Sequence, residues 1–295
     1  MLMRDSDPLA RCGTAAHMGN AMRDMPFSAN TVLPPEPRAY RGVNWDGLRA
    51  LYIREVRRFW KVGLQTLAAP IVTALLYMMV FVVAVGGTRP TVEGVPFSAF
   101  IAPGLIMMQI LGNAFSNSSS SLLQAKMNGL IGDFLTPPLS PGELVAGFAL
   151  GALTRGILVG TVAAVAIFPF AHIGFAHIWA IAYFSVGAAL IMGLLGAMTA
   201  IWSEKFDHIA AVTNFIVMPM TFLSGTFYLV SKLPEPFRTA SQFNPFFYLI
   251  AGFRYGFTGH TDGSLMVGVV VTAALVVFLW WGVWRMFVTG YKLKT

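Results

Sequence analysis

One basic residue, Arg155, lies well inside an apolar stretch of the sequence, twelve residues after Glu143. At about 1.5 Å per helical residue, its Cα would lie roughly 18 Å along a helix that begins at Glu143, past the middle of a hydrocarbon core about 30 Å thick. A charge at that depth is costly in lipid and commonly marks a substrate or ion path. Arg155 therefore either ties helices together through backbone carbonyls or lines such a path.

Uncharged polar residues share these apolar stretches. Four consecutive serines, Ser118 to Ser121, follow two asparagines, and a third asparagine lies near Met218. Small polar side chains also let helices pack closely, so for the serines both interpretations stay open. Together with Arg155, the candidates for lining a path are Asn113, Asn117, Asn214 and Met218. We interpret four glycines as packing positions: Gly147, Gly151, Gly193 and Gly196.

Other chemistry is missing from the sequence. No Lys follows a Gly, so the phosphate-binding loop GxxxxGK[ST] is absent and this chain does not hydrolyse ATP by that route. His172 and His177 have no Cys or acidic residue close in sequence, so we expect no metal site. No set of residues resembles a catalytic triad or a carboxylate pair, and we expect a transport subunit rather than an enzyme.

Composition and hydropathy place these residues in a polytopic membrane protein. Of the 295 residues, 56% are hydrophobic and only 11% are charged, whereas about a quarter are charged in soluble domains. The fold class that we predict is all-α, with spans near 63–86, 97–122, 143–168, 178–202, 208–230 and 265–288. These belong to one membrane domain over residues 63–290.

The basic residues sort by position between the spans. With the N-terminus inside, fifteen Lys and Arg residues are cytoplasmic and four are outside, which predicts both termini in the cytoplasm by the positive-inside rule. The net charge of +7 follows this sorting, so we expect no nucleic-acid partner.

Two segments precede the first span. Residues 1–43 have no apolar period and predict a disordered cytoplasmic tail. Residues 44–62 predict an amphipathic helix lying in the membrane interface. Its predicted apolar face consists of Trp45, Leu48, Tyr52, Val56, Phe59 and Gly63, and its basic arc of Arg54, Arg57, Arg58 and Lys61.

The outer segment 231–264, between the fifth and sixth spans, predicts a re-entrant helical hairpin. Asn244 followed by Pro245 is a helix-start signal, with Asn244 as N-cap. The apolar run that follows is too short to cross a bilayer, so it should enter the membrane and return. Arg254 should lie near the C-terminal end of this helix, where a cation is favourable.

The inner loop, residues 124–142, contains a short amphipathic stretch from Met127 to Leu135, closed by Pro137 and Pro138. A short helix on the cytoplasmic face suits docking to a partner, and a plain interfacial turn explains the pattern equally well.

Taken together, residues 45–290 resemble the permease subunits of type-two ATP-binding-cassette exporters, and among these the YadH-like group. The resemblance rests on three motifs, of which the last is the most specific: Pro103 to Met108, Thr154 to Gly156, and Phe243 to Gly256. It implies a six-span subunit that dimerises and recruits two cytoplasmic ATPase subunits. ATP and Mg²⁺ would be bound there, with no cofactor on this chain.

The same resemblance implies roles for particular residues. The inner loop would couple to the ATPase through Lys126, Leu130, Asp133 and Phe134. The hairpin would form an outer gate through Asn244, Pro245, Tyr248 and Arg254.

The function expected is therefore export of a hydrophobic, lipid-linked or glycan-type substrate from the cytoplasm, in the inner membrane of a bacterial cell. The partners expected are a cytoplasmic ATPase subunit, a second copy of the chain and membrane lipid. The alternative is a secondary transporter or channel without an ATPase partner. No carboxylate lies well inside a span, where it could relay protons, which favours the first function.

Overall fold

The computed structural model describes residues 42–86, 91–92, 94–135, 138–171 and 174–293. The predicted disordered tail up to residue 41 lies outside the described residues, as do Arg89 and His172.

The described chain is almost entirely helical. The six-span prediction is confirmed, because six stretches are long and apolar enough to cross a membrane. In chain order the elements are α2 (Trp45–Lys61), α3 (Gly63–Gly86), β1 (Thr91–Val92), β2 (Val95–Pro96), α4 (Phe97–Met127), α5 (Gly132–Leu135), α6 (Pro141–Ile167), α7 (Ile178–Trp202), α8 (Phe206–Val212), the π-helical segment η1 (Thr213–Val217), α9 (Met218–Leu223), the 3-10 segment η2 (Val230–Lys232), α10 (Phe237–Phe243), α11 (Pro245–Thr258) and α12 (Leu265–Thr289). The two strands form a small antiparallel hairpin in which Val92 pairs with Val95.

The fifth span differs from its prediction. It ends at Leu223 instead of residue 230, and it is built from α8, η1 and α9 in succession. The chain leaves the helix at Ser224 and turns at Gly225, whose φ of 76° lies in the left-handed region that glycine adopts readily. The apolar residues after this turn extend the hydropathy signal but do not extend the helix.

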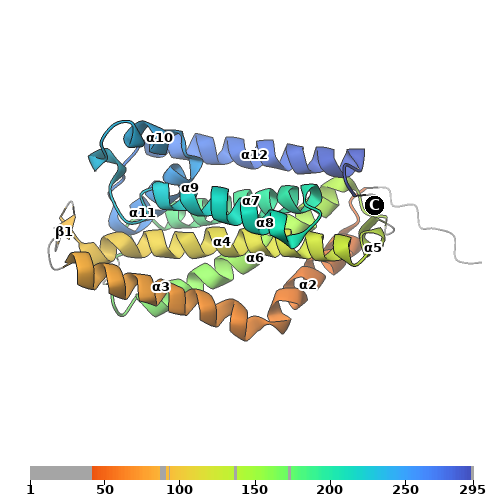
Figure 1. Cartoon of the computed structure of the whole chain (residues 1–295), viewed down its shortest axis with the longest axis horizontal. Helices are drawn as coiled ribbons and strands as arrows, with labels where there is room; N and C mark the ends of the chain where they lie inside the picture. The colour runs from red at the N-terminus through yellow and green to blue at the C-terminus, as the bar shows by residue number, and fades with distance from the viewer. Residues whose placement is uncertain (1–41, 87–90, 93, 136–137, 172–173, 294–295) are drawn as a thin grey trace, which may run out of the picture. The chain divides into compact units, whose positions relative to one another are not determined.

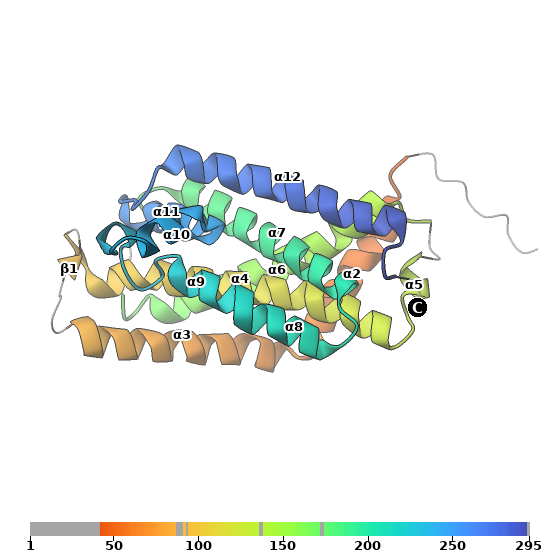
Figure 2. The ribbon, with the colours of Figure 1, turned by 45° about the horizontal axis from the view of Figure 1, so that its top comes forward.

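Helix α4 is the central helix of the bundle, and most of its residues are buried. It runs along the bundle in Figure 1, and in Figure 2 α3 and α12 lie on opposite sides of it. Its closest neighbour is α7, where a Cβ added to Gly196 would meet the carbonyl oxygen of Phe115 at 2.5 Å. A Cβ on Gly193 would likewise meet Ala152 of α6 at 2.5 Å. Both glycines thus allow close helix packing.

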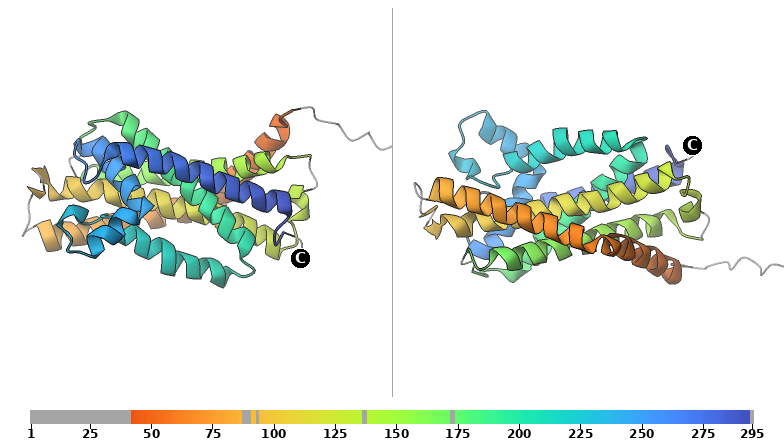
Figure 3. Two further views of the ribbon diagram at one scale, coloured as in Figure 1. Left: turned by 90° about the horizontal axis from the view of Figure 1, so that it is seen from above. Right: turned by 60° about the horizontal axis from the view of Figure 1, so that its bottom comes forward.

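Helices α2 and α3 follow one another along one side of the bundle and meet at Val62 and Gly63 (Figure 3, right). Helix α2 packs mainly on α6, whereas α3 continues along α4 and α6. Much of α3 is exposed, including Leu64 at 86%. The fifth span also exposes apolar side chains, with Phe215 at 81%.

The outer segment folds as two short helices, α10 and α11, between the fifth span and α12. Helix α11 has 14 residues, or about 21 Å at 1.5 Å per residue, which is less than a hydrocarbon core about 30 Å thick. It packs between α7, α12 and α4 and is buried over most of its length. The re-entrant placement in a bilayer stays a prediction.

Candidate functional site

Helix α2 is joined to α6 by close packing. The residues it buries are Leu51, Glu55 and Phe59, spaced four apart on one face. Two glycines of α6 receive them: a Cβ on Gly147 would lie 2.4 Å from Leu51 Cδ2, and a Cβ on Gly151 would lie 2.7 Å from Glu55 Cβ. These glycines are therefore packing positions, and their partner helix is α2.

The starts of α2 and α6 are also linked by hydrogen bonds. Asn44 caps α2 by accepting from the Gly47 N–H at 2.9 Å. The Asn44 N–H in turn donates to Glu143 Oε1 at 2.6 Å. Glu143 simultaneously completes the capping box of α6, since its Oε2 accepts from the Ser140 N–H at 2.7 Å. One carboxylate thus serves both helix ends.

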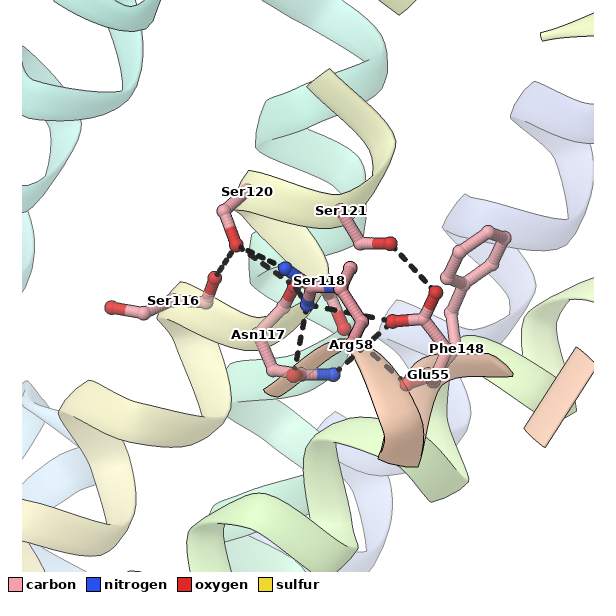
Figure 4. Close-up of polar contacts among 8 residues, drawn as sticks. All are labelled: Glu55, Arg58, Ser116, Asn117, Ser118, Ser120, Ser121 and Phe148. Carbon is pink, nitrogen blue, oxygen red and sulfur yellow. Dashed lines mark hydrogen bonds and ion pairs between the residues drawn. The ribbon is translucent and has the colours of Figure 1, made fainter. Parts of the chain in front are cut away.

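A buried polar network lies where α2 meets α4 (Figure 4). Glu55 is fully buried; its carboxylate accepts from Ser121 Oγ at 2.6 Å and from Asn117 Nδ2 at 3.4 Å. Arg58 lies 3.5 Å from the same carboxylate and donates from Nη2 to Asn117 Oδ1 at 3.0 Å. It also donates to the Asn117 carbonyl at 2.7 Å and to Ser120 Oγ at 3.1 Å.

Burial of this ion pair disfavours the charged form of Arg58. Desolvation lowers the pKa of the Arg58 guanidinium from its ordinary value, and the neighbouring Glu55 carboxylate opposes that shift. Side chains and a carbonyl of α4 satisfy the Glu55 carboxylate and both terminal nitrogens of Arg58, whereas Arg58 Nε is buried without a hydrogen-bond partner among the described residues. Two sequence expectations change as a result: Arg58 faces inward, not toward the exposed arc, and Asn117 is a fully buried partner, not an open lining residue.

Arg155 and Asn113, both predicted to line a path, are brought together. Arg155 Nη2 donates to Asn113 Oδ1 at 3.4 Å. Both residues line an open cavity of about 360 Å³ at the junction of α2 and α3. The remaining lining residues are Val62, Gln65, Thr66, Ala69 and Pro70.

Two other predicted lining residues lie elsewhere. Asn214 is exposed on η1, and Met218 is exposed at 41% on the following turn. Neither residue lines the cavity that contains Arg155. A π-helical turn such as η1 often marks a functional site, so a role at a subunit contact stays open.

In the inner loop, α4 continues to Met127 and only Gly132–Leu135 forms a separate helix, so the expected helix from Met127 to Leu135 is wrong in extent. Leu130 and Asp133 are exposed. Lys126 donates from Nζ to the carbonyls of Ile201 and Ser203 at the end of α7, both at 2.9 Å.

Phe134 is 4% exposed and packs on Phe148 at 5.4 Å between ring centroids. Arg54 of α2 also lies over the Phe134 ring, with its guanidinium carbon 4.0 Å from the ring centroid. This cation–π contact joins the inner loop directly to α2.

At the outer end, Asn244 caps α11 as the sequence predicts, accepting from the Phe246 N–H at 3.0 Å. Its amide also donates to the Met220 carbonyl at 2.6 Å and to Ser224 Oγ at 2.8 Å, which ties α11 to the end of the fifth span. Pro245 is the first helical residue, and Tyr248 is half-buried against Phe247.

Arg254 lies near the C-terminal end of α11, and its side chain reaches the turn after α9. It donates to the Gly225 carbonyl at 2.7 Å and stacks on Phe100 of α4 at 4.1 Å. The carbonyl belongs to the turn after α9, not to the end of α11 itself. Gly104 of α4 faces the same turn, since a Cβ there would lie 2.5 Å from the Thr226 oxygen. Arg254 therefore joins three elements of the outer end.

Glu55 is the buried residue of this polar network that the sequence analysis missed. A helical wheel that separates aromatic from basic residues leaves it unassigned. Two signals would have found it: Leu51, Glu55 and Phe59 repeat every four residues, and Gly147 and Gly151 repeat with the same spacing on α6.

Comparisons with known proteins give a family and several full-length relatives. Residues 46–258 match the model of the family described as "ABC-2 type transporter". The inner membrane transport permease YadH of Escherichia coli (strain K12) is 33% identical over 255 residues, which cover 85% of this chain and 98% of the relative. Nodulation protein J of Rhizobium leguminosarum bv. viciae is 24% identical over 249 residues, covering 81% and 92%.

Proposed function

Because the chain belongs to the ABC-2 type transporter family, we propose that it is the permease subunit of an ATP-driven exporter. It is a multi-pass membrane protein, and the 33% identical relative is named an inner membrane transport permease, which supports the bacterial inner membrane as its location. In this proposal both termini are cytoplasmic. The exported molecule is hydrophobic, lipid-linked or glycan-type. ATP and Mg²⁺ bind to a separate cytoplasmic ATPase subunit.

The observation that carries this proposal beyond the family is the contact between the inner loop and α2. Phe134 is held under Arg54, and beside it Leu130 and Asp133 are exposed. A docking subunit would contact these two exposed residues. A movement of the docked subunit would shift the inner loop. The shift would pass to α2 through Phe134 and from α2 to α4 through the Glu55–Arg58 network. Lys126 and Phe134 hold the loop in place in this scheme, while Leu130 and Asp133 meet the partner.

In this proposal the chain forms a homodimer, which would cover part of the exposed apolar surface of α3 and of the fifth span. Helix α3 and the fifth span expose long apolar surfaces, which in a membrane contact either lipid or a second copy. Asn214 and Met218 lie on such a face and would line the contact or a path between two subunits. The outer gate is assigned to α10 and α11, whose connection to the fifth span through Asn244 and Arg254 would open or close that path.

The experiment is co-purification of the affinity-tagged chain with a cytoplasmic ATPase, followed by ATPase and export assays in vesicles. Leu130→Asp should lose stimulation of the ATPase while the chain inserts and melts normally, because a charge in an apolar contact is left without a partner. Phe170→Asp, which introduces the same charge at an exposed apolar position in the turn after α6, is the matched control. Transport that persists without any ATPase would instead support the alternative, a secondary transporter or channel.

A further inference from the structure

The cavity around Arg155 lacks a counter-charge. Among the described residues the ion pairs are Arg58–Glu55 and Lys292–Glu204, and Arg155 takes part in neither. Its one hydrogen bond there is the 3.4 Å contact to Asn113, which is longer than the usual range of about 2.7–3.2 Å. The guanidinium Nε is buried without a hydrogen-bond partner in the described part of the chain.

The polar groups around Arg155 suit an anion. The cavity is lined by the side chains of Gln65, Thr66 and Asn113 and by apolar groups, and it contains no carboxylate to repel a negative charge. Its volume of about 360 Å³ is on the order of ten times the roughly 30 Å³ that one water occupies in the liquid. It therefore has room for more than one water beside the guanidinium.

The polar face of α4 separates two guanidinium groups with different surroundings. Asn113 and Asn117 are one helical turn apart, and each accepts from an arginine. Arg58, on Asn117, is neutralised by Glu55. Arg155, on Asn113, faces the open cavity. An arginine fork recognises phosphate or carboxylate through two parallel hydrogen bonds, and Arg155 has N–H groups left for such contacts.

We infer that this cavity is a binding site for an oxyanion, and that phosphate is the oxyanion it binds. The group is carried by a lipid headgroup or is a free oxyanion; the recognition chemistry is the same. That the bound group belongs to the exported molecule rests on the proposed function, whereas the binding itself does not. If so, the cargo carries a phosphate or a similar anion near its polar end.

The test uses the purified full-length chain in detergent without the ATPase, so its result is independent of transport. Native mass spectrometry measures retention of phosphatidylglycerol and of diacylglycerol, which lacks phosphate. Thermal unfolding with and without inorganic phosphate reports free-anion binding. Arg155→Met removes the charge, and Ala69→Phe keeps the charge but fills the cavity. Arg285→Met removes an exposed cation from another spanning helix and is the matched control.

We expect Arg155→Met to lower phosphatidylglycerol retention about tenfold, as the loss of a charged hydrogen bond predicts, with Arg285→Met unchanged. Ala69→Phe should lower retention by a similar factor because it fills the cavity. Diacylglycerol retention should not respond to Arg155→Met. Stabilisation by phosphate that is lost in Arg155→Met, without a lipid effect, identifies a free oxyanion as the ligand. If Arg155→Met fails to fold, Arg155→Lys and Ala69→Phe carry the comparison. Equal retention and equal phosphate response in wild type and these variants would overturn the inference.

Discussion

The Glu55–Arg58 pair permits a prediction with a worked magnitude. Glu55→Gln keeps the volume and leaves an amide oxygen to accept from Ser121, but it removes the charge that neutralises Arg58. Breaking a fully buried pair costs about 3–5 kcal/mol. Because the Arg58 side chain is 26% exposed, we expect the lower end of that range, about 3 kcal/mol.

For a membrane domain of this size, that loss corresponds to a fall of roughly 6–12 °C in melting temperature. The assay is thermal unfolding of the detergent-purified chain, followed by fluorescence. Arg57→Met, an exposed cation on the same helix, is the control and should melt within roughly 2 °C of wild type.

A double-mutant cycle separates the ion pair from other losses. Glu55→Gln combined with Arg58→Met removes both charges, so no unpaired cation remains. The double variant should recover part of the loss, with a coupling energy of about 1–3 kcal/mol. Two results would refute the reasoning: wild-type melting in Glu55→Gln, or a double variant whose loss equals the sum of the single losses.

Three further outcomes are expected. Gly151→Ala should lower the free energy of unfolding by about 1–3 kcal/mol, because α2 must move away from the added methyl group. Gly142→Ala, with open space at its Cβ, is the control and should be neutral or raise that free energy by up to about 1 kcal/mol. Equal melting temperatures for the two variants would contradict the packing role of Gly151. Asn244→Leu removes a helix cap and two bonds to the fifth span, so a loss of about 2 kcal/mol or more is expected, together with ATPase activity that no longer matches export; full export at normal abundance would leave α11 without a gating role. The hydrogen bond from Lys292 lowers the pKa of Glu204. Any stabilisation from this exposed pair is therefore present above the ordinary carboxyl pKa and is lost as pH falls through the lowered pKa. A difference in melting temperature between wild type and Glu204→Gln that persisted at pH 2 would exclude the ion pair as its cause.

The spanning helices could be predicted from the sequence because hydropathy measures what a bilayer requires. The predicted span 178–202 agrees with α7, and the N-cap at Asn244 follows from local chemistry. The end of the fifth span could not be found in this way. The turn at Gly225 is fixed by tertiary contacts, among them the Arg254 guanidinium and the surface of Gly104.

The buried polar network between α2 and α4 was harder to predict for a different reason. Glu55 lies in a helix whose other charges are mostly basic and exposed, so its sequence neighbours suggest a solvated position. Its burial depends on Ser121 and on Gly151, which are far away in sequence. Conversely, Phe134 belongs to a stretch that predicts an exposed docking helix, yet its ring is covered by Arg54.

The carboxylate of Glu143 has a mechanical consequence. Because it accepts from the N–H of Ser140, the N-cap of α6, and from the N–H of Asn44 at once, the two helices cannot slide along each other without breaking one of these hydrogen bonds. The close contact between Gly151 and Glu55 resists the same sliding further along the two helices. Helices α2 and α6 should therefore move as one stiff unit, with the inner loop at one end and Val62 and Gly63, where α3 begins, at the other. A displacement of the inner loop would then reach Val62 and change the width of the Arg155 cavity, which Val62 lines together with residues of α3, α4 and α6.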